Sequence, residues 1–527
     1  MSRREMDAFR LIGRRQFMEL CAGSLAAAAV GCGRREDRAQ AAHSSVTVLY
    51  PGDQEGSLWT ESPSQSLVFL PLVGSNEKGE LQGRLAESWQ HSPDFRTWTV
   101  HLRKDVWWHD GVPVTARDIK FTLDLLAHPD FHYYPRDAFT IEVLDDSSYT
   151  ITCHNKATGS PLDDWTVYYP KHLLERFDPK KYWDWEFWRH PVGDGPYRFL
   201  RRVPKTMVEL EANPNYYAGK PRIERVVLKF GDPSGSGALL ELLSGNVDAI
   251  PWMNRAGLAK LQGDPRFRVY DSVYHARVKA IAWNERRALF ADAKIRRALT
   301  LAINRRELHQ LLNFPEWTPI FDVLFTRDQL RRGELPPPLP YDPKQAGRLL
   351  DEAGWRAQAG DGARQREGKP FRFTLLVYPI SGMNEAAIYV QAALRRLGIQ
   401  MDISTMDEQA QRERVGAGDF DAAIFIMPEG GPFGPRAFFG DHSLVGYKNP
   451  TVIALLDKAQ ATANPEEIDR IHRELAPIFQ ADLPATFLYP AVYATVAHRR
   501  VRGLSSPYRA GPVGDMEHLW LENDARR

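Results

Sequence analysis

The adjacent residues His109 and Asp110 are the pair in this sequence that most suggests acid–base chemistry. A carboxylate beside an imidazole can orient the ring as a general base. However, Asp110 is followed by Gly111, and Asp-Gly is a common turn pair. The segment before it alternates like a half-buried strand, with Trp98 and Val100 on one face. The pattern therefore favours a turn after a strand, with His109 packed or hydrogen-bonded locally.

Other catalytic patterns are missing from the sequence. There is no G-x-S-x-G, H-E-x-x-H, C-x-x-C, G-x-G-x-x-G or P-loop motif. The 15 histidines are scattered along the sequence, which does not favour a metal site. We therefore expect neither an enzyme nor a protein with a metal or another cofactor.

The bulk composition limits the class of protein. A chain of 527 residues is too long for one ordinary core, so two or three domains are expected. After residue 41 the chain carries 60 basic and 62 acidic residues, which argues against nucleic acid as the main partner. Of the three cysteines, Cys21 and Cys32 precede this region, and Cys153 stands alone. No disulfide framework is expected, and Cys153 is predicted to be a buried strand residue.

The N-terminus, residues 1–41, has the features of an export signal. Arg14 and Arg15 form a twin-arginine pattern, and an uncharged stretch too short to span a bilayer follows. Two endings remain open. Residues 29–32 are similar to a lipobox, in which Cys32 would be acylated after cleavage on its N-terminal side. Residues 39–41 are similar to an A-x-A site, which would give ordinary cleavage after Ala41. We favour the lipobox, which predicts an extracytoplasmic protein tethered to the membrane by a lipid on Cys32.

Several secondary structure elements follow from local patterns. Val46 to Tyr50 predicts a strand, and Thr115 with Asp118 predicts a capped helix start. Residues 371–403 read as strand, helix and strand, which favours a parallel α/β core. The aromatic run from Tyr182 to Trp188 allows two interpretations: domain packing, which we favour, or an aromatic wall for a ligand.

The segment from Leu81 to Phe121, LQGRLAESWQHSPDFRTWTVHLRKDVWWHDGVPVTARDIKF, resembles the signature of the extracellular solute-binding proteins of family 5. These are the oligopeptide-, dipeptide- and nickel-binding components of ABC importers. Further matches lie at residues 190–197, 213–221, 290–305 and 341–355. At residue 194 an aspartate replaces the threonine of the family pattern. The resemblance covers nearly all of the chain after Val46.

This resemblance implies an α/β fold with two lobes, periplasmic-binding-protein-like (type II, cluster C), and an additional inserted α/β domain. The expected division follows the chain order: residues 46–83 for the first part of lobe I, 84–189 for the inserted domain, 190–280 for the second part of lobe I, 281–489 for lobe II, and 490–527 for a return segment of lobe I.

The resemblance also points to a ligand segment, and there the sequence departs from the family. Peptide binders hold the ligand's amino terminus on an aspartate, in a segment that corresponds to residues 421–439 here. Gly431 and Arg436 stand where carboxylates are common, and Glu429 is the nearest acid. Either Glu429 holds an amine, or Arg436 binds an anionic group, or both are solvated loop charges. Trp283 and Phe433 are expected to supply apolar or stacking contacts.

The function implied is that of a monomeric solute-binding protein that hands a peptide-like or other small organic solute to an ABC permease in the membrane. Two alternatives remain from sequence: a ligand-sensing extracytoplasmic receptor component, and a secreted two-lobed hydrolase. The hydrolase would need a nucleophile and base converging in the cleft.

Overall fold

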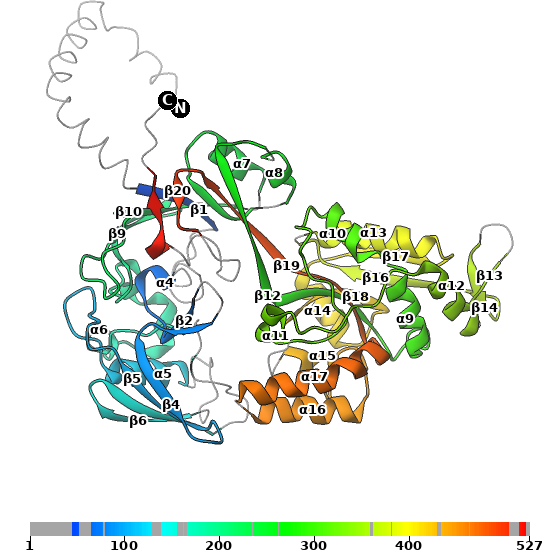
Figure 1. The fold of residues 1–527 in the computed structure, drawn as a ribbon, viewed down its shortest axis with the longest axis horizontal. Coiled ribbons are helices and arrows are strands. Elements are labelled where there is room, and N and C mark those ends of the chain that lie inside the picture. Colours follow the sequence, from blue (N-terminus) through cyan, green and yellow to red (C-terminus); the bar gives the residue numbers. More distant parts are fainter. Residues whose placement is uncertain are drawn as a thin grey trace, which may run out of the picture.

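The computed structural model describes residues 45–51, 65–76, 80–128, 139–154, 162, 166–233, 235–253, 255–261, 263–358, 362–380, 382–428, 434–462, 464–504 and 516–522. These residues form two bodies joined by two long crossing strands (Figure 1). We call the body that contains the first strand lobe I and the other lobe II. The two-lobed α/β fold expected from the sequence is therefore confirmed.

Lobe I is built on five strands of a mixed sheet. Its central strand β1 (Ser45–Pro51) lies parallel to β10 (Arg225–Gly231) and β11 (Ala249–Met253). Antiparallel strands β9 (Met207–Ala212) and β8 (Tyr197–Val203) extend the sheet to its edge. Val46 and Val48 have no exposed surface, as the alternation of the predicted strand requires. Short helices α4 (Gln65–Val68), α7 (Ser236–Leu243) and α8 (Arg255–Ala259) and the hairpin strands β2 (Val73–Ser75) and β3 (Leu81–Gly83) complete lobe I.

The inserted domain is a four-stranded antiparallel sheet with one long helix. The strand order is β4 (Ala86–His91), β5 (Thr97–Leu102), β7 (Ser148–Cys153) and β6 (Phe139–Asp145). Helix α5 (Ala116–Leu126) begins at Thr115, which forms a capping box with Asp118 as predicted. The remaining helical turns are α6 (Lys171–Leu174), η2 (Pro179–Asp184) and η3 (Glu186–Arg189).

The aromatic run from Tyr182 to Trp188 serves packing. Tyr182, Trp185 and Trp188 are at most 4% exposed and belong to the main hydrophobic core, where Trp185 and Trp188 stack with ring centroids 6.2 Å apart. Trp188 Nε1 donates to the carbonyl of Tyr182, so its polar atom is satisfied inside the core. The interpretation of this segment as domain packing is therefore supported for these rings. Cys153 is buried in strand β7, as expected.

Lobe II contains the parallel strands β16 (Arg372–Val377), β17 (Gln400–Thr405) and β18 (Ala422–Pro428). Helix α13 (Met383–Arg395) connects the first two, which confirms the strand–helix–strand interpretation of residues 371–403. The other helices are α9 (Ala293–Leu301), α10 (Arg305–Leu311), α11 (Arg327–Arg332), α12 (Pro343–Glu352), α14 (Glu408–Gly416), α15 (Gly434–Phe439), α16 (Pro450–Ala461) and α17 (Pro465–Asp482), and a small sheet holds β13 (Arg356–Ala357), β14 (Arg364–Arg366) and β15 (Lys369–Pro370).

Two strands belong to both lobes. Strand β12 (Phe267–Trp283) pairs antiparallel with β19 (Ala485–His498) from Phe267 opposite His498 to Ala282 opposite Ala485. Within the described residues they join all ten strands of the main sheet into one, in the order β17-β16-β18-β12-β19-β11-β1-β10-β9-β8. The expected divisions at residues 280/281 and 489/490 therefore fall inside β12 and β19. The register shifts between Tyr274 and Val278 and again after Lys279.

The C-terminal segment is anchored to lobe I. It contains β20 (Val501–Arg502), η4 (Met516–His518) and β21 (Trp520–Leu521). Glu517 accepts hydrogen bonds from the Arg84 guanidinium and, at 2.5 Å, from the Tyr216 hydroxyl. None of the helices in the described part of the chain has the length and apolarity that crossing a membrane would require.

Candidate functional site

The parallel strands of lobe II present their carboxyl ends to lobe I. Strand β18 pairs with β12 so that its last residue, Pro428, lies opposite Arg277, which is where β12 enters lobe II. Strands β16 and β17 run parallel to β18 and therefore end at the same edge. Ligands of open α/β sheets bind outside the carboxyl ends of the strands. This edge of lobe II is consequently the candidate binding edge of the lobe.

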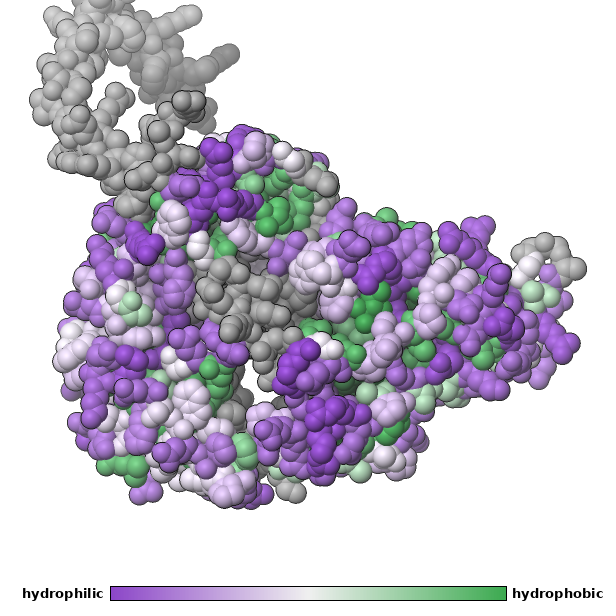
Figure 2. All heavy atoms as spheres, in the orientation of Figure 1, coloured by the Kyte–Doolittle hydropathy of each residue, from purple (hydrophilic) through white to green (hydrophobic). Residues whose placement is uncertain are grey.

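Lobe I presents the equivalent edge from the other side. Ala249 of β11 lies opposite Ala497 of β19, and Met253 lies opposite Ala494, so β11 runs toward the middle of β19 and toward lobe II. Because β1 and β10 are parallel to β11, their carboxyl ends also face the same side. The two binding edges thus converge on the crossing strands. Figure 2 shows the surfaces of the two bodies from the same side, and we call the region between their facing edges, beside β12 and β19, the interlobe recess.

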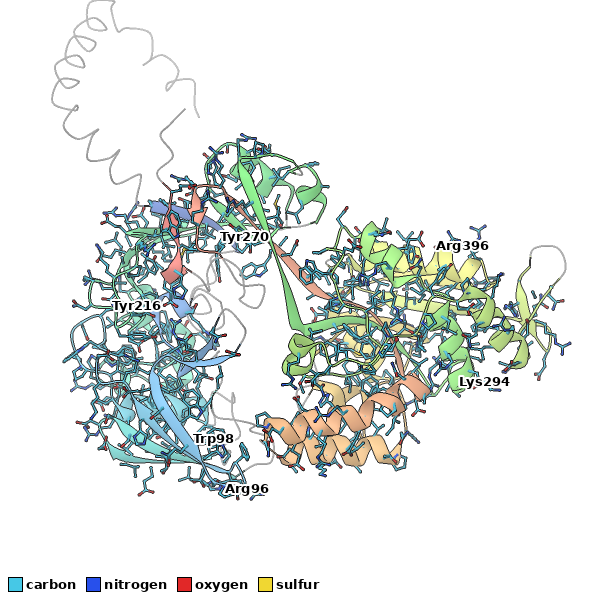
Figure 3. The ribbon with its side chains drawn as sticks, in the orientation of Figure 1. Arg96, Trp98, Tyr216, Tyr270, Lys294 and Arg396 are labelled. Atoms are coloured by element: carbon cyan, nitrogen blue, oxygen red, sulfur yellow. The ribbon has the colours of Figure 1, made fainter. Side chains whose placement is uncertain are left out.

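Aromatic side chains mark the lobe I edge. Trp252 sits where the register of β11 shifts, and its φ of 55° lies in the left-handed region that a bulky residue rarely adopts. Its ring makes an edge contact with Tyr50 at the end of β1, with centroids 6.0 Å apart. Tyr270, on β12, extends toward the space between the bodies (Figure 3). Backbone strain of this kind is concentrated at functional sites, so we identify Trp252 as a candidate ligand contact.

A buried lysine marks the lobe II edge. Lys279 is 4% exposed and lies opposite Tyr489 in the sheet, with its Nζ 5.9 Å from the centre of that ring. Such a cation–π contact partly offsets the cost of burying the ammonium group. A side chain at position 382 would place its Cβ 3.6 Å from the Tyr489 hydroxyl, so this hydroxyl lies close to the backbone of Gly382. Burial raises the pKa of Tyr489, which keeps the phenol neutral.

Of the site residues expected from the sequence, Trp283 lies in the core of lobe II. Its side chain is 0% exposed, its Nε1 donates to Thr486 Oγ1 at 3.1 Å, and its ring packs on Phe290 and Phe373. The expected contact with a ligand is therefore wrong for this residue, because the ring has no surface left to offer. The sequence reasoning missed that Trp283 ends strand β12 deep inside lobe II, beyond the part that borders the recess.

The Arg436 side chain is held in place by contacts within lobe II. Its guanidinium donates to Gln460 at 2.7 Å and pairs with Asp457 and Asp441 at 2.5 and 2.9 Å. Two carboxylates already compensate this cation, so the geometry does not favour an additional anion at Arg436. Glu429, Phe433 and Cys32 lie outside the described residues, and their expected roles stay predictions.

His109 and Asp110 do not form a catalytic pair. His109 Nδ1 accepts from the Gly193 amide at 3.2 Å, and its Nε2 donates to the Gly195 carbonyl at 3.0 Å. Burial lowers the pKa of His109 to about 4, although the bond to Gly195 opposes the shift. Asp110 instead faces His172, at 2.8 Å from its Nε2. The imidazole therefore ties the signature turn to the loop at residues 193–195. Its role is structural, as expected, but its hydrogen-bond partners are distant in sequence and not local.

Metal coordination has no candidate in the described part of the chain, where no group of three His, Cys, Asp or Glu residues is placed to hold an ion. Trp252 and Lys279, in contrast, were not singled out from the sequence. A sequence signal for Trp252 existed, since it follows Pro251 within an apolar strand. Lys279 sits in the run Val278–Trp283, which is otherwise apolar apart from this one charge.

Known proteins match this chain over most of its length. The family model for bacterial extracellular solute-binding proteins, family 5 (middle region), matches residues 80–441. A Brucella ovis protein named as an ABC transporter peptide-binding protein is 29% identical over 84% of this chain and 87% of its own length. The oligopeptide-binding protein AppA of Bacillus subtilis is 26% identical over 81% of each chain. The nickel-binding periplasmic protein of Escherichia coli is 26% identical over 76% of this chain and 78% of its own.

Solved structures share the fold. NikA from Brucella suis, in complex with Fe(III)-EDTA, superposes with a TM-score of 0.76 at 20% identity, over 91% of this chain and 100% of its own. AppA from Bacillus subtilis, in complex with a nonapeptide, superposes with a TM-score of 0.67 at 23% identity, over 91% and 99% of the two chains. The family model spans well over half of the sequence, and the fold agrees with it. The chain therefore belongs to the bacterial extracellular solute-binding proteins of family 5.

Proposed function

We propose that this protein is the solute-binding component of an ABC importer, which captures a peptide-like or other small organic solute in the interlobe recess and delivers it to a membrane permease. The observation that carries the proposal is the convergence of both binding edges on β12 and β19. Two strands are a thin connection, so the lobes can close on a solute by bending there. The named relatives, which bind peptides and nickel, support the same role.

The decisive experiment is identification of the solute. Mass spectrometry of the purified protein after denaturation would reveal a co-purified ligand, and calorimetry against di-, tri- and nonapeptides and the nickel–histidine chelate would measure its affinity. Binding of one of these solutes with a 1:1 stoichiometry would support the proposal. A protein that binds none of them and carries no solute would contradict it.

Trp252 is expected to contribute to this binding. Its ring is partly exposed on the lobe I edge and is fixed against Tyr50, so it offers an apolar face at little entropic cost. The substitution Trp252→Ala should weaken the affinity for the identified solute by about 10- to 100-fold, as truncation of an aromatic hot spot does. Trp183→Ala is the matched control, because Trp183 is 48% exposed on the inserted domain. Equal affinities of the two variants would refute this role.

We further propose that the protein is exported by the twin-arginine pathway and anchored through a lipid on Cys32. The arginine pair at residues 14 and 15 and the lipobox-like residues 29–32 support this route. Cys32→Ser should move the protein from the membrane fraction to the soluble extracytoplasmic fraction and remove the acyl mass from its N-terminus. Cys21→Ser serves as the control. Persistence of the Cys32→Ser variant in membranes would argue for another anchor.

A further inference from the structure

The turn between β4 and β5, residues 92–96, lies at one end of the inserted domain and is held by side-chain and backbone contacts. Phe95 has a φ of 56°, in the left-handed region, and its ring stacks on His91 with centroids 3.9 Å apart. Its carbonyl accepts from Trp98 Nε1 at 2.9 Å, and Ser92 Oγ accepts from the Thr97 amide at 3.0 Å. A strained backbone persists only where its surroundings hold it, so this β4–β5 turn is rigid.

The β4–β5 turn carries an exposed cation. Arg96 follows Phe95, and its guanidinium makes no ion pair or hydrogen bond with another side chain of the described ranges. Arg96 lies at the end of the inserted domain that is nearest, in the view of Figure 3, to the first residues of α17. A long cationic side chain at the tip of a rigid turn is suited to meet a carboxylate on another surface.

The corner between α16 and α17 carries an exposed anion. Asn464 caps α17 through the amides of Glu466 and Glu467, which fixes the first turn of the helix. Glu467 is engaged with Lys458 and Arg470, at 3.6 and 3.2 Å. Glu466 is exposed and, within the described residues, has no ion pair.

These two features belong to different lobes and lie far from the crossing strands. Figure 1 shows the β4–β5 end of the inserted domain and the start of α17 on the same side of the interlobe space, at the end remote from the upper part of β12 and β19. Bending at the crossing strands moves the most distant points farthest. Closing of the lobes would therefore change the separation between the β4–β5 turn and the α16–α17 corner.

We propose that the β4–β5 turn and the α16–α17 corner form a latch that holds the closed state, in which Arg96 pairs with Glu466. The latch adds to the proposed solute binding and is independent of which solute is bound. Closing would place the two exposed charges in contact on surfaces that are both preformed. An ion pair between preformed surfaces loses less side-chain and backbone freedom than one that must order its own loops.

A cysteine trap tests the latch without a solute. In the full chain with Cys21, Cys32 and Cys153 replaced by serine or alanine, Pro93→Cys and Pro465→Cys place one thiol on each surface and leave Arg96 and Glu466 intact. Both prolines are exposed. Copper-phenanthroline would drive disulfide formation, followed by non-reducing electrophoresis and peptide mapping. The control pair is Lys205→Cys with Pro465→Cys, because Lys205 is exposed in the β8–β9 turn of lobe I.

The 93/465 pair should crosslink at least about tenfold faster than the control pair, because closing raises the effective concentration of its thiols. Arg96→Glu should slow this crosslinking by about two- to fivefold, the range of an exposed ion pair. Adding Glu466→Arg should restore the rate. Equal rates in the two cysteine pairs, or a rate that does not respond to the charge reversal, would overturn the latch. Because no solute is added, these outcomes are separate from any failure of solute binding.

Discussion

Replacing Asp322 by asparagine is expected to lower the free energy of unfolding of lobe II by about 3 to 5 kcal/mol, the cost of breaking a buried ion pair on one side. Asp322 and Arg305 have side-chain exposures of 0% and 3%. The carboxylate accepts from Arg305 Nη1 and Nη2 at 2.5 and 3.1 Å, and from the Leu339 amide at 2.6 Å. Asparagine keeps the shape but removes the charge, so the buried guanidinium would lose its compensation.

The measurement is the shift of the urea unfolding midpoint of Asp322→Asn relative to the native chain, with unfolding monitored by tryptophan fluorescence. The control is Asp402→Asn, which breaks the pair of Asp402 with Arg372, whose side chains are 53% and 63% exposed. Exposed pairs contribute at most about 1 kcal/mol, so this control should unfold almost like the native chain. A loss of less than about 1 kcal/mol for Asp322→Asn would mean that water or a neighbouring acceptor replaces the carboxylate.

Asp194→Asn is expected to stabilise the protein, and increasingly so as the pH rises toward 8. Asp194 is 2% exposed, and burial raises its pKa from 3.8 to about 8. Its Oδ1 accepts from the Leu70 amide at 2.8 Å, and its Oδ2 has no partner among the described residues. Loss of hydration on burial is the largest cause of the raised pKa of Asp194, and the charge of Arg84 opposes it only in part.

The sign of the pH dependence follows from proton binding. Between pH 4 and 8 the folded state keeps the proton on Asp194 while the unfolded state has lost it, so stability falls as the pH rises through this range. At about 1.4 kcal/mol per pKa unit, the raised pKa of Asp194 lowers the free energy of unfolding by on the order of 5 kcal/mol by pH 8. Urea midpoints from pH 5 to 9 should therefore fall more steeply for the native chain than for Asp194→Asn.

Two comparisons sharpen this result. Burial also raises the pKa of Glu285, to about 7, so Glu285 contributes to the pH dependence of the stability of the native chain. This contribution is the same in Asp194→Asn, so it cancels when the urea midpoints of the native chain and the variant are subtracted. Asp194→Thr, which restores the residue of the family pattern, should flatten the curve in the same way. Parallel curves for the native chain and both variants would show that Asp194 is ionised and solvated in the folded protein.

Local sequence signals predicted the local structure well. Thr115 and Asp118 form the capping box that their spacing suggested. Cys153 lies in strand β7, as predicted. These features depend on residues within a few positions of one another, so the sequence contains all of the information that they require.

The sequence also determined the family, because a signature of some forty residues carries many matches in fixed order. The binding residues needed the tertiary structure. Trp283 looked available for stacking, but the length of β12 carries it into the core of lobe II. Trp252 and Lys279 lie near the facing edges of the two lobes because strands distant in sequence converge there, and Arg436 is paired by helix α16. Each of these outcomes depends on contacts between segments far apart in the chain, which local spacing does not encode.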